Sequence, residues 1–353
     1  MNENAENPFT LSFGEKPYQY VERSLATEKL IRDMTSAHPA HRTFIVSGVR
    51  GSGKTVFLTN VMNKMETLGD WIVIELNPED DMREALAAKL YSHAKIKHLF
   101  LEKEFSFSFQ GISFSIKGKN PAPNIDELLS KMFLALKRSG KKVLVCVDEV
   151  SSTAIMRRFA LSFQILIRQG CDLFFLRTGL FENVSELENR KNLTFLIRAS
   201  KTELSSLSLS SIASSYMKSL EVDKAKGEEL ARATKGYAFA FQLLGYLLFR
   251  SGQRSLSEAI LQEYDENLSS YVYEKIWSTC SENDKKFLLA FPSDEGAETK
   301  EVLAGSKLSK DSFSTYRSRL LSKGIIVSLG WGRLMLALPR FREFMDSKLI
   351  MDY

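Results

Sequence analysis

The chain has 353 residues, of which 44% are hydrophobic and 26% are charged, and its formal net charge at pH 7 is +5. A chain of this length and composition can form two or three domains with hydrophobic cores of ordinary size. The small excess of positive charge permits contact with nucleic acid but does not by itself indicate it.

Cysteine usage and hydropathy exclude several classes of protein. Cys146, Cys171 and Cys280 are far apart in the chain, which argues against a disulfide framework or a zinc site and predicts a reducing compartment, the cytoplasm. No apolar run approaches the roughly 18 residues that a membrane helix needs, so we expect no contact with a membrane. The polar and acidic segment Met1–Asn7 lacks the features of a signal peptide.

The first predicted elements surround a glycine-rich motif. Residues 8–22 mix proline, glycine and aromatic residues, as extended or turn-rich chain does, and a helix is predicted over 25–37. The apolar run Thr43–Val46 predicts a strand, and Val56–Met65 predicts a helix. The motif between them has the pattern G-x-x-x-x-G-K-T and consists of Gly48, Val49, Arg50, Gly51, Ser52, Gly53, Lys54 and Thr55.

A loop of this pattern between a strand and a helix is typical of a phosphate-binding loop. The glycines let backbone N–H groups converge on phosphate oxygens, and the helix N-terminus adds partial positive charge. We expect Lys54 to reach the β- and γ-phosphates and the Thr55 hydroxyl to hold Mg²⁺. The motif therefore predicts that the chain binds a nucleoside triphosphate.

After a strand over 71–76 and a helix over 80–94, the pattern changes. In residues 105–116, phenylalanine or isoleucine alternates with serine on both sides of Gln110–Gly111, which predicts a β-hairpin. One interpretation is a protruding hairpin that contacts DNA or a partner. We favour a hairpin laid on its own domain, because its apolar face needs cover.

A second motif follows a helix that ends near Arg138. The run Lys142–Val147 is apolar without alternation, which predicts a buried parallel strand, and it ends in Asp148 and Glu149. We expect Asp148 to bind Mg²⁺ through water and Glu149 to orient or deprotonate an attacking water. The simpler alternative, two solvated acids after a strand, is disfavoured by the preceding phosphate loop.

The alternation of strands and helices continues. A helix is predicted near 155–169 and a buried strand over 172–176, ending at Arg177–Gly179. Such alternation predicts an α/β fold with a parallel sheet. A short strand is expected near 202–204, and the residues from 208 to 277 are predicted to be helical.

The C-terminal segment has a different pattern. Helices are predicted over 284–290, 299–304 and 310–322, followed by a hairpin of 325–328 and 333–338. Three helices and a hairpin describe a winged helix.

Charge in this segment favours nucleic acid as a partner. Ser312, Ser314, Thr315 and Arg319 are candidates for the major groove. The cations that we assign to DNA are Lys310, Arg317, Arg319, Lys323 and Arg333. The alternatives are a winged helix that binds protein and basic faces that are merely solvated.

The nucleotide motifs, the helical segment and the C-terminal pattern together resemble AAA+ ATPases, in particular prokaryotic ATP-binding proteins near the origin-recognition and STAND branches. Residues Asn7–Pro17 and Val21–Arg23 are similar to the N-terminal segment of that group, although Glu22 stands where glycine is usual. Gly236–Gly245 is similar to its lid-helix signature, and Phe341–Phe344 to the end of its winged helix.

The resemblance implies further site residues. Residues from Pro17 to Val21, with Tyr18, Tyr20 and Val21 as the candidates, would pack against adenine. Thr178 would be a polar sensor between Asp148 and the γ-phosphate. Arg198 would be an arginine finger that acts on a neighbouring subunit, which implies self-association; a surface arginine is the alternative.

One departure from the family concerns the lid. Origin-recognition initiators carry an arginine there that senses nucleotide, and Gly236–Ala238 offers none. Lys235 is the nearest cation.

The resemblance also implies the domain organisation: an α/β P-loop NTPase core of the AAA+ type over 1–203, with the hairpin at about 105–116, a helical lid over 204–280 and a winged-helix domain over 281–353. The expected function is an ATP- and Mg²⁺-dependent ATPase that acts as a switch and binds double-stranded DNA through the winged helix. The alternative is a STAND-like signalling ATPase whose winged helix binds a protein partner. A metabolic P-loop kinase is a third possibility, against which the lid and the winged helix argue.

Overall fold

The computed structural model describes residues 6–12, 17–101, 106–109, 112–115, 124–190 and 193–351. The chain forms two compact units. The first comprises Ser24–Ser47 and Lys54–Glu203, and the second comprises Met1–Arg23, Gly48–Gly53 and Leu204–Tyr353. The N-terminal segment and most of the glycine-rich motif, which we predicted within the core domain, thus belong to the second unit.

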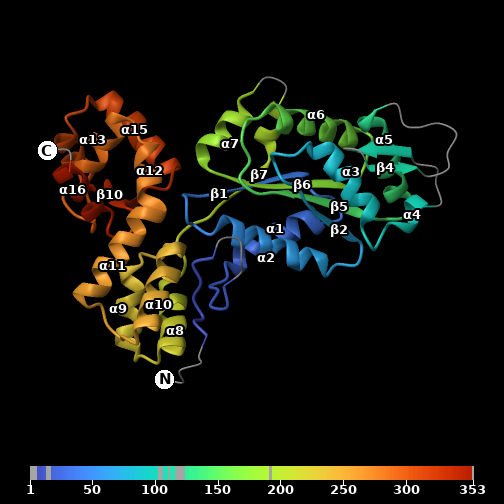
Figure 1. The fold of residues 1–353 in the computed structure, drawn as a ribbon. Coiled ribbons are helices and arrows are strands. Elements are labelled where there is room, and N and C mark those ends of the chain that lie inside the picture. The colour runs from blue at the N-terminus through green and yellow to red at the C-terminus, as the bar shows by residue number, and fades with distance from the viewer. Residues whose placement is uncertain are drawn as a thin grey trace. The chain divides into compact units, whose positions relative to one another are not determined.

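A five-stranded parallel sheet forms the centre of the first unit (Figure 1). The strand order is β2-β5-β6-β1-β7. The strands are β1 (Thr43–Ser47), β2 (Trp71–Glu75), β5 (Lys142–Val147), β6 (Leu173–Gly179) and β7 (Ser200–Glu203). The predicted parallel α/β sheet is confirmed, and so is the short strand expected near 202–204.

Helices cover both faces of this sheet (Figure 1). One face carries α1 (Ser24–Thr35) and α2 (Lys54–Glu66), and the other carries α3 (Met82–Ser92), α5 (Ile125–Arg138), α6 (Ala154–Arg168) and α7 (Phe181–Glu188). The short helix α4 (His98–Leu101) contacts α5, and the 3₁₀ turn η1 (Thr194–Arg198) precedes β7. Residues Val143–Val147 of β5 are all buried, because each face of the strand meets helices. This burial on both faces explains why the strand sequences show no alternation.

The hairpin predicted at 105–116 is present as two strands. β3 (Ser106–Phe109) pairs antiparallel with β4 (Ile112–Ser115), and Phe107 is opposite Phe114. Phe105, the turn at Gln110–Gly111 and Ile116 lie outside the described residues. The choice between a protruding hairpin and one covered by its own domain stays a prediction.

A helical bundle occupies the second unit. It consists of α8 (Leu209–Leu220), α9 (Lys224–Ala233), α10 (Ala238–Ser251), α11 (Glu258–Leu268), the π-helical turn η2 (Ser269–Tyr273) and α12 (Glu274–Ser278). The N-terminal segment packs on this bundle through Phe9, whose ring centroid lies 5.8 Å from that of Tyr216 and 5.7 Å from that of Phe241. Gly245 makes room for Phe9, because a Cβ at this position would lie 2.5 Å from the ring.

The C-terminal elements of the second unit have the order of a winged helix. They are α13 (Glu282–Leu289), β8 (Ala297–Glu298), α14 (Thr299–Ser306), α15 (Lys310–Ser322), β9 (Ile326–Gly330), β10 (Arg333–Leu336) and α16 (Phe341–Met351). The side chain of Ser309 caps α15 by accepting from the N–H of Ser312. The three helices and the hairpin match the prediction, and β8 adds a third strand in the order β8-β10-β9. We call residues 281–351 the winged-helix segment.

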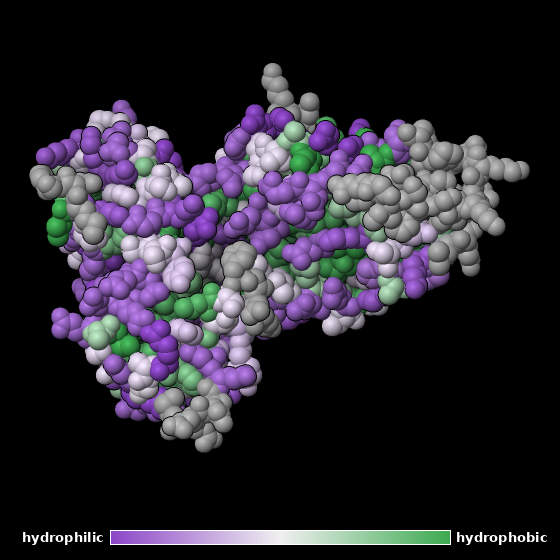
Figure 2. Space-filling view, viewed as in Figure 1, coloured by the Kyte–Doolittle hydropathy of each residue, from purple (hydrophilic) through white to green (hydrophobic). Residues whose placement is uncertain are grey.

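Hydrophilic residues predominate on the visible face of the described part of the chain (Figure 2). In Figure 2 that face is mostly hydrophilic, and its hydrophobic residues lie in small groups. None of the helices in the described part of the chain is long and apolar enough to cross a bilayer. Trp331, in the turn between β9 and β10, is fully exposed.

A buried arginine ties β6 to η1 in the first unit. Arg177 is 0% exposed; its Nη2 donates to the Glu188 carboxylate at 3.2 Å and to the Leu196 carbonyl at 3.4 Å. The Glu188 carboxylate also accepts from Lys201 at 2.7 Å. Burial lowers the pKa of Arg177 to about 10, against the opposing effect of Glu188. The residue after Arg177 is the predicted sensor Thr178, so this ion pair supports the strand end at which that side chain is placed.

Arg177→Ala should strongly destabilise the first unit. The substitution leaves the buried Glu188 with a single cation and creates a cavity, so we expect a loss of about 3–5 kcal/mol in the free energy of unfolding. The measurement is urea unfolding followed by circular dichroism and tryptophan fluorescence. Arg190→Ala is the matched control, because its ion pair with Glu186 is exposed and should contribute less than about 1 kcal/mol. Equal losses in the two variants would contradict a buried, structure-determining ion pair.

Candidate functional site

The glycine-rich loop of the second unit has a compact and defined conformation. Gly51 and Gly53 have φ angles of 76° and 87°, in the left-handed region that favours glycine. Between them, the N–H of Ser52 donates to the carbonyl of Val49 at 3.1 Å and closes a turn. The loop follows β1 directly in the chain and precedes Lys54, the first residue of α2. The strand–loop–helix context predicted from the motif is therefore present.

Three residues of the second unit bind consecutive carbonyls of this loop. The Tyr237 hydroxyl donates to the carbonyl of Arg50 at 2.5 Å, and the Phe239 N–H donates to that of Gly51 at 3.1 Å. The Arg23 guanidinium donates to the carbonyl of Ser52 at 2.9 Å. Sequence reasoning noticed Tyr237 only as part of a lid signature and assigned Arg23 no role. Their contacts with the loop lie 29 to 187 residues away along the chain, so no local pattern signals them.

The polar groups of the motif fit an anionic ligand. The Ser52 hydroxyl is buried and has no hydrogen-bond partner among the described residues, and such a group would pair with a phosphate oxygen. In the first unit, Lys54 is only 6% exposed at the start of α2, where the helix N-terminus also favours negative charge. The Lys54 ammonium and the N-terminus of α2 in the first unit, and the Ser52 hydroxyl in the second unit, are each groups of the kind that binds phosphate.

The carboxylate of Asp148 is the centre of a network in the first unit. Its Oδ2 accepts from the Thr55 hydroxyl at 2.6 Å, and its Oδ1 accepts from the Thr178 hydroxyl. The backbone N–H of Glu149 lies 3.2 Å from Asp148 Oδ1 and 3.1 Å from Thr178 Oγ1. The structure thus brings together four residues that the sequence predicted for metal binding and catalysis: Thr55, Asp148, Glu149 and Thr178.

Glu149 has an unusual backbone conformation. Its φ angle is 52°, which places a residue with a side chain in the left-handed region. Such conformations cost about 1–3 kcal/mol and persist where the surroundings determine them; here the N–H bonds to Thr178 and Asp148 do so. The side chain is exposed. It is therefore available to accept a proton from a water molecule at this edge of the sheet.

The oxygen donors at Thr55 and Asp148 suit Mg²⁺. This ion prefers oxygen ligands, keeps several waters and is commonly held by one or two protein groups together with substrate phosphates. The described residues contain no cluster of three or more histidine, cysteine, aspartate or glutamate side chains that could hold a metal by themselves. Thr55 and Asp148 could therefore hold Mg²⁺ together with water molecules and the phosphates of a bound substrate.

The remaining predicted nucleotide-site residues lie in different surroundings. Arg198 is exposed at the end of η1, and its carbonyl bonds to His41 Nδ1 at 2.9 Å, which fixes the backbone but leaves the guanidinium accessible. In the second unit Tyr18 is 86% exposed, whereas Tyr20 and Val21 are partly buried. Burial raises the pKa of Tyr20.

The predicted DNA surface of the winged-helix segment is corrected in part. Lys310 and Arg333 are exposed and Arg317 is partly exposed, but Lys323 is only 9% exposed, with its Nζ 3.5 Å from the Thr279 carbonyl. Arg319 is held by the buried Asp284 and donates to the Ser281 hydroxyl at 2.7 Å. Arg319 thus ties α15 to the cap and first turn of α13, whereas the Lys323 ammonium lies at the end of α12, just outside the segment.

Two family models match parts of the chain. The KAP family P-loop domain matches residues 23–157, which include the glycine-rich motif and Asp148. A domain of unknown function (DUF8462) matches residues 270–345, which include most of the winged-helix segment. A search of curated protein sequences finds no significant match.

Solved structures similar to the chain share its fold over nearly its whole length. The Walker-type ATPase PABY2304 of Pyrococcus abyssi is 12% identical, with 93% of this chain and 96% of that chain covered and a TM-score of 0.64. The ORC2 protein of Aeropyrum pernix, solved as ADPNP–ADP complexes, is 15% identical, with 100% and 98% covered and a TM-score of 0.52. The similarities confirm the predicted α/β fold, and the family match places a P-loop domain in residues 23–157.

Gly51→Ala should distort the loop. A Cβ at this position would lie 2.0 Å from the Tyr237 hydroxyl oxygen and would require the strained φ of 76°. Gly140→Ala is the matched control, because Gly140 also has a left-handed φ, 64°, but open space around it. We expect both variants to lose about 1 kcal/mol in stability from strain. Only Gly51→Ala should in addition weaken binding of a fluorescent ATP analogue, by about tenfold or more. Equal affinities for the analogue would show that the loop tolerates displacement of Tyr237.

Proposed function

We propose that the chain is a Mg²⁺-dependent ATPase that acts as a molecular switch and binds DNA through its winged-helix segment. The observation that carries the ATPase part is the network in which Asp148 accepts hydrogen bonds from both Thr55 and Thr178, with Glu149 beside it. The matched P-loop domain and the fold support nucleotide binding.

In this proposal the loop and the start of α2 bind the phosphates. The N–H groups of the loop, the Ser52 hydroxyl and the Lys54 ammonium would contact the β- and γ-phosphate oxygens. The buried position of Lys54 strengthens this attraction, because a charge near low-dielectric surroundings is screened less than one in water. The partly buried Tyr20 and Val21, with the exposed Tyr18, remain the candidates for contact with adenine.

Thr55 and Asp148 would hold the metal ion. Mg²⁺, when bound, neutralises negative charge on the β- and γ-phosphates. The Thr55 hydroxyl now donates to Asp148, so its lone pairs are free to face a cation, and Asp148 would act directly or through water. Thr178 keeps the Asp148 carboxylate oriented by donating to its second oxygen.

Glu149 would be the general base of hydrolysis. Its carboxylate takes a proton from water while the water oxygen forms a bond to the γ-phosphorus. The bond between that phosphorus and the β–γ bridging oxygen breaks, and ADP and inorganic phosphate are released. Arg198 is exposed, as a finger that reaches the γ-phosphate of a second copy must be, and this role would make turnover depend on self-association.

The DNA part of the proposal depends on the exposed cations of the winged-helix segment. Lys310 lies at the start of α15, Arg333 lies at the start of β10, and both can meet phosphates. Arg317 and the exposed Ser314 and Thr315 on α15 would face the bases.

A second candidate function is a signalling ATPase whose winged-helix segment binds a protein. The observation that favours it is that two of the cations predicted for DNA contact other groups of the chain: Arg319 pairs with Asp284, and Lys323 lies against the Thr279 carbonyl. The exposed apolar residues Leu329 and Trp331 at the wing, 46% and 104% exposed, would suit a protein surface.

Two substitutions separate nucleotide binding from hydrolysis. Lys54→Ala should weaken ATP binding by about 100-fold, because it removes a charge-assisted contact with the phosphates. Glu149→Gln should keep ATP binding but lower kcat by roughly 100- to 10,000-fold, because the amide cannot accept the proton. Calorimetric titration and phosphate release measure the two effects. Lys64→Ala, on the same helix, is the control for Lys54→Ala and should behave as wild type. Unchanged turnover in Glu149→Gln would rule out this residue as the base.

Binding to labelled duplex DNA tests the partner. Anisotropy at low and physiological salt, with and without ATP–Mg²⁺, should show binding that weakens steeply with salt and changes with nucleotide. Lys310→Ala/Arg333→Ala should lower the salt slope by about 2. Lys224→Ala/Arg232→Ala removes two exposed cations of α9 and is the matched control. No DNA binding in a chain that binds ATP would favour the protein partner instead.

A further inference from the structure

The segment Lys235–Gly236–Tyr237 joins α9 to α10 in a single defined conformation. Lys235 and Gly236 have φ angles of 48° and 73°, so two consecutive residues are left-handed. Thr234 fixes the turn, because its hydroxyl accepts from the N–H of Gly236 at 3.1 Å and its carbonyl accepts from that of Tyr237 at 2.8 Å. A Cβ on Gly236 would lie 2.5 Å from the Leu207 carbonyl oxygen. The geometry leaves the side chains on either side of Gly236 with fixed directions.

On one side of this turn, Tyr237 binds the phosphate-binding loop. The side chain is 5% exposed, and its hydroxyl donates to the Arg50 carbonyl at 2.5 Å. Burial raises the pKa of Tyr237 far above the physiological range, so the hydroxyl keeps its proton and remains a donor. The ring packs against the loop so closely that Gly51 can have no side chain.

The carbonyl contacts determine where the loop N–H groups point. In a planar trans peptide, the C=O of one residue and the N–H of the next lie on opposite sides. Tyr237 at the Arg50 carbonyl and Arg23 at the Ser52 carbonyl therefore fix the N–H directions of Gly51 and Gly53. These N–H groups lie on the side away from the two donors, where a phosphate can accept from them.

On the other side of the turn, Lys235 binds the winged-helix segment. Its Nζ donates to the Asp294 carbonyl at 2.8 Å and to the Leu336 carbonyl at 3.2 Å, and it forms an ion pair with the Asp294 carboxylate at 3.1 Å. Leu336 is the last residue of β10, and Asp294 precedes β8. Both side chains of the ion pair are 19% exposed. Lys235 is the cation nearest to the position where a lid arginine was expected. Its ammonium anchors the wing, and its three N–H groups are used by these contacts, so none remains for a phosphate.

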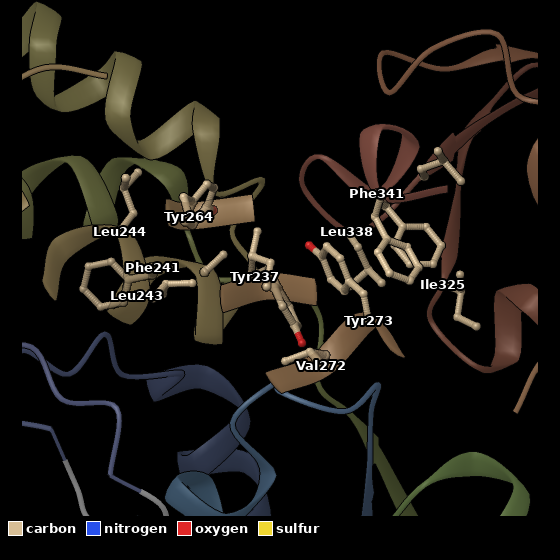
Figure 3. Close-up of a cluster of buried hydrophobic side chains, with 14 of the residues drawn as sticks. Tyr237, Phe241, Leu243, Leu244, Tyr264, Val272, Tyr273, Ile325, Leu338 and Phe341 are labelled. Atoms are coloured by element: carbon tan, nitrogen blue, oxygen red, sulfur yellow. The ribbon is translucent and has the colours of Figure 1, made fainter. Parts of the chain in front are cut away.

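A shared core supports this anchor. Figure 3 shows Tyr273 of η2 beside Phe341 and Leu338 of the winged-helix segment, with Tyr237 and Tyr264 nearby. The Tyr273 hydroxyl donates to the Pro339 carbonyl at 2.5 Å, and its ring meets that of Phe341 edge to face at 5.0 Å between centroids. The bundle and the winged-helix segment therefore share one packed interior, in which a shift of one element displaces its neighbours.

We propose that Lys235, Gly236 and Tyr237 form a relay that couples occupancy of the phosphate-binding loop to the winged-helix segment. Tyr237 is a positioning residue for the loop, and Lys235 is its counterpart at the wing. The relay rests on the nucleotide binding proposed above. In origin-recognition initiators, an arginine of the lid senses the nucleotide directly. In this relay, Tyr237 senses the conformation of the loop through the Arg50 carbonyl.

Thermodynamics requires such a coupling to act in both directions. A nucleotide that binds one loop conformation more tightly shifts the turn toward the matching conformation, and a partner bound at the wing changes nucleotide affinity by the same factor. Only Gly236 separates Tyr237, which contacts Arg50, from Lys235, which contacts Leu336, so the two sites have a short physical connection.

Four variants of the full chain isolate the relay. Tyr237→Phe removes the hydroxyl that binds the loop, and Lys235→Met removes the ammonium that binds the wing. Tyr216→Phe is the control for the first, because it removes a buried hydroxyl that donates to the Phe241 carbonyl at 2.8 Å within the bundle. Lys226→Gln is the control for the second, because it breaks an ion pair with Glu229 in α9 that touches neither site.

The test combines binding of AMP-PNP–Mg²⁺ with hydrogen–deuterium exchange of residues 290–345, with and without that nucleotide. In the wild type and in both controls, AMP-PNP should slow exchange in these residues. Tyr237→Phe should weaken AMP-PNP binding by about three- to tenfold and lose the change in exchange. Lys235→Met should bind AMP-PNP within about twofold of wild type and still lose the change in exchange.

The outcomes distinguish the relay from the nucleotide site. Wild type that binds AMP-PNP without any change in exchange of residues 290–345 would overturn the relay and leave the ATPase proposal intact. The relay would also be overturned if AMP-PNP changed the exchange of these residues in Lys235→Met and Tyr237→Phe as fully as in wild type. The same holds if the two control variants lost the change in exchange to the same extent. Wild type that binds no AMP-PNP would overturn the proposed function, and the relay with it.

Discussion

The arrangement of side chains at the carboxyl ends of β5 and β6 depends on the hydrogen bonds that the Asp148 carboxylate accepts. It accepts hydrogen bonds from Thr55 on α2 and from Thr178 on β6, which lie 93 and 30 residues away in the chain. Parallel strands place their carboxyl ends at one edge, so β5 and β6 bring these groups together without any long loop. The same network holds the N–H of Glu149 and so maintains a left-handed backbone that would otherwise relax. One side chain thus orders the three residues that we propose as metal ligand, sensor and base.

The conformation of the glycine-rich loop depends on a different set of contacts, the hydrogen bonds that its backbone carbonyls accept. Tyr237, Phe239 and Arg23 each bind one of three successive carbonyls, so protein groups set the loop conformation before any ligand arrives. Preorganisation of this kind lowers the entropy cost of binding. It also makes the loop sensitive to the bundle, because any displacement of the three donors turns the N–H groups on the opposite side of each peptide.

The sequence could predict features that a local pattern of residues indicates, but not features that depend on contacts between residues far apart in the chain. The glycine-rich motif and the apolar strand before Asp148 carry strong local signals, and the parallel sheet with these residues at one edge follows from alternation alone. The strand β8 was missed because two residues show no periodicity. The roles of Tyr237 and Arg23 as donors to the loop were missed, because every residue has a backbone carbonyl. The sequence therefore does not show which carbonyl a distant side chain will bind. The grouping of Gly48–Gly53 with the second unit likewise depends on distant contacts, with Tyr237 and Phe239.

The winged-helix segment shows how a count of charges overstates a binding surface. Lys323 is buried against the end of α12, and Arg319 neutralises Asp284 in the first turn of α13, so two of the five predicted cations have partners within the chain. If Lys310 and Arg333 contact phosphates, counterion release from about two contacts gives a salt slope of only about −1.8. Binding that depends on so few contacts is weak at physiological salt for a single copy. Two copies held together by Arg198 at a shared nucleotide would double the number of contacts without any new residue, so self-association and DNA affinity would increase together.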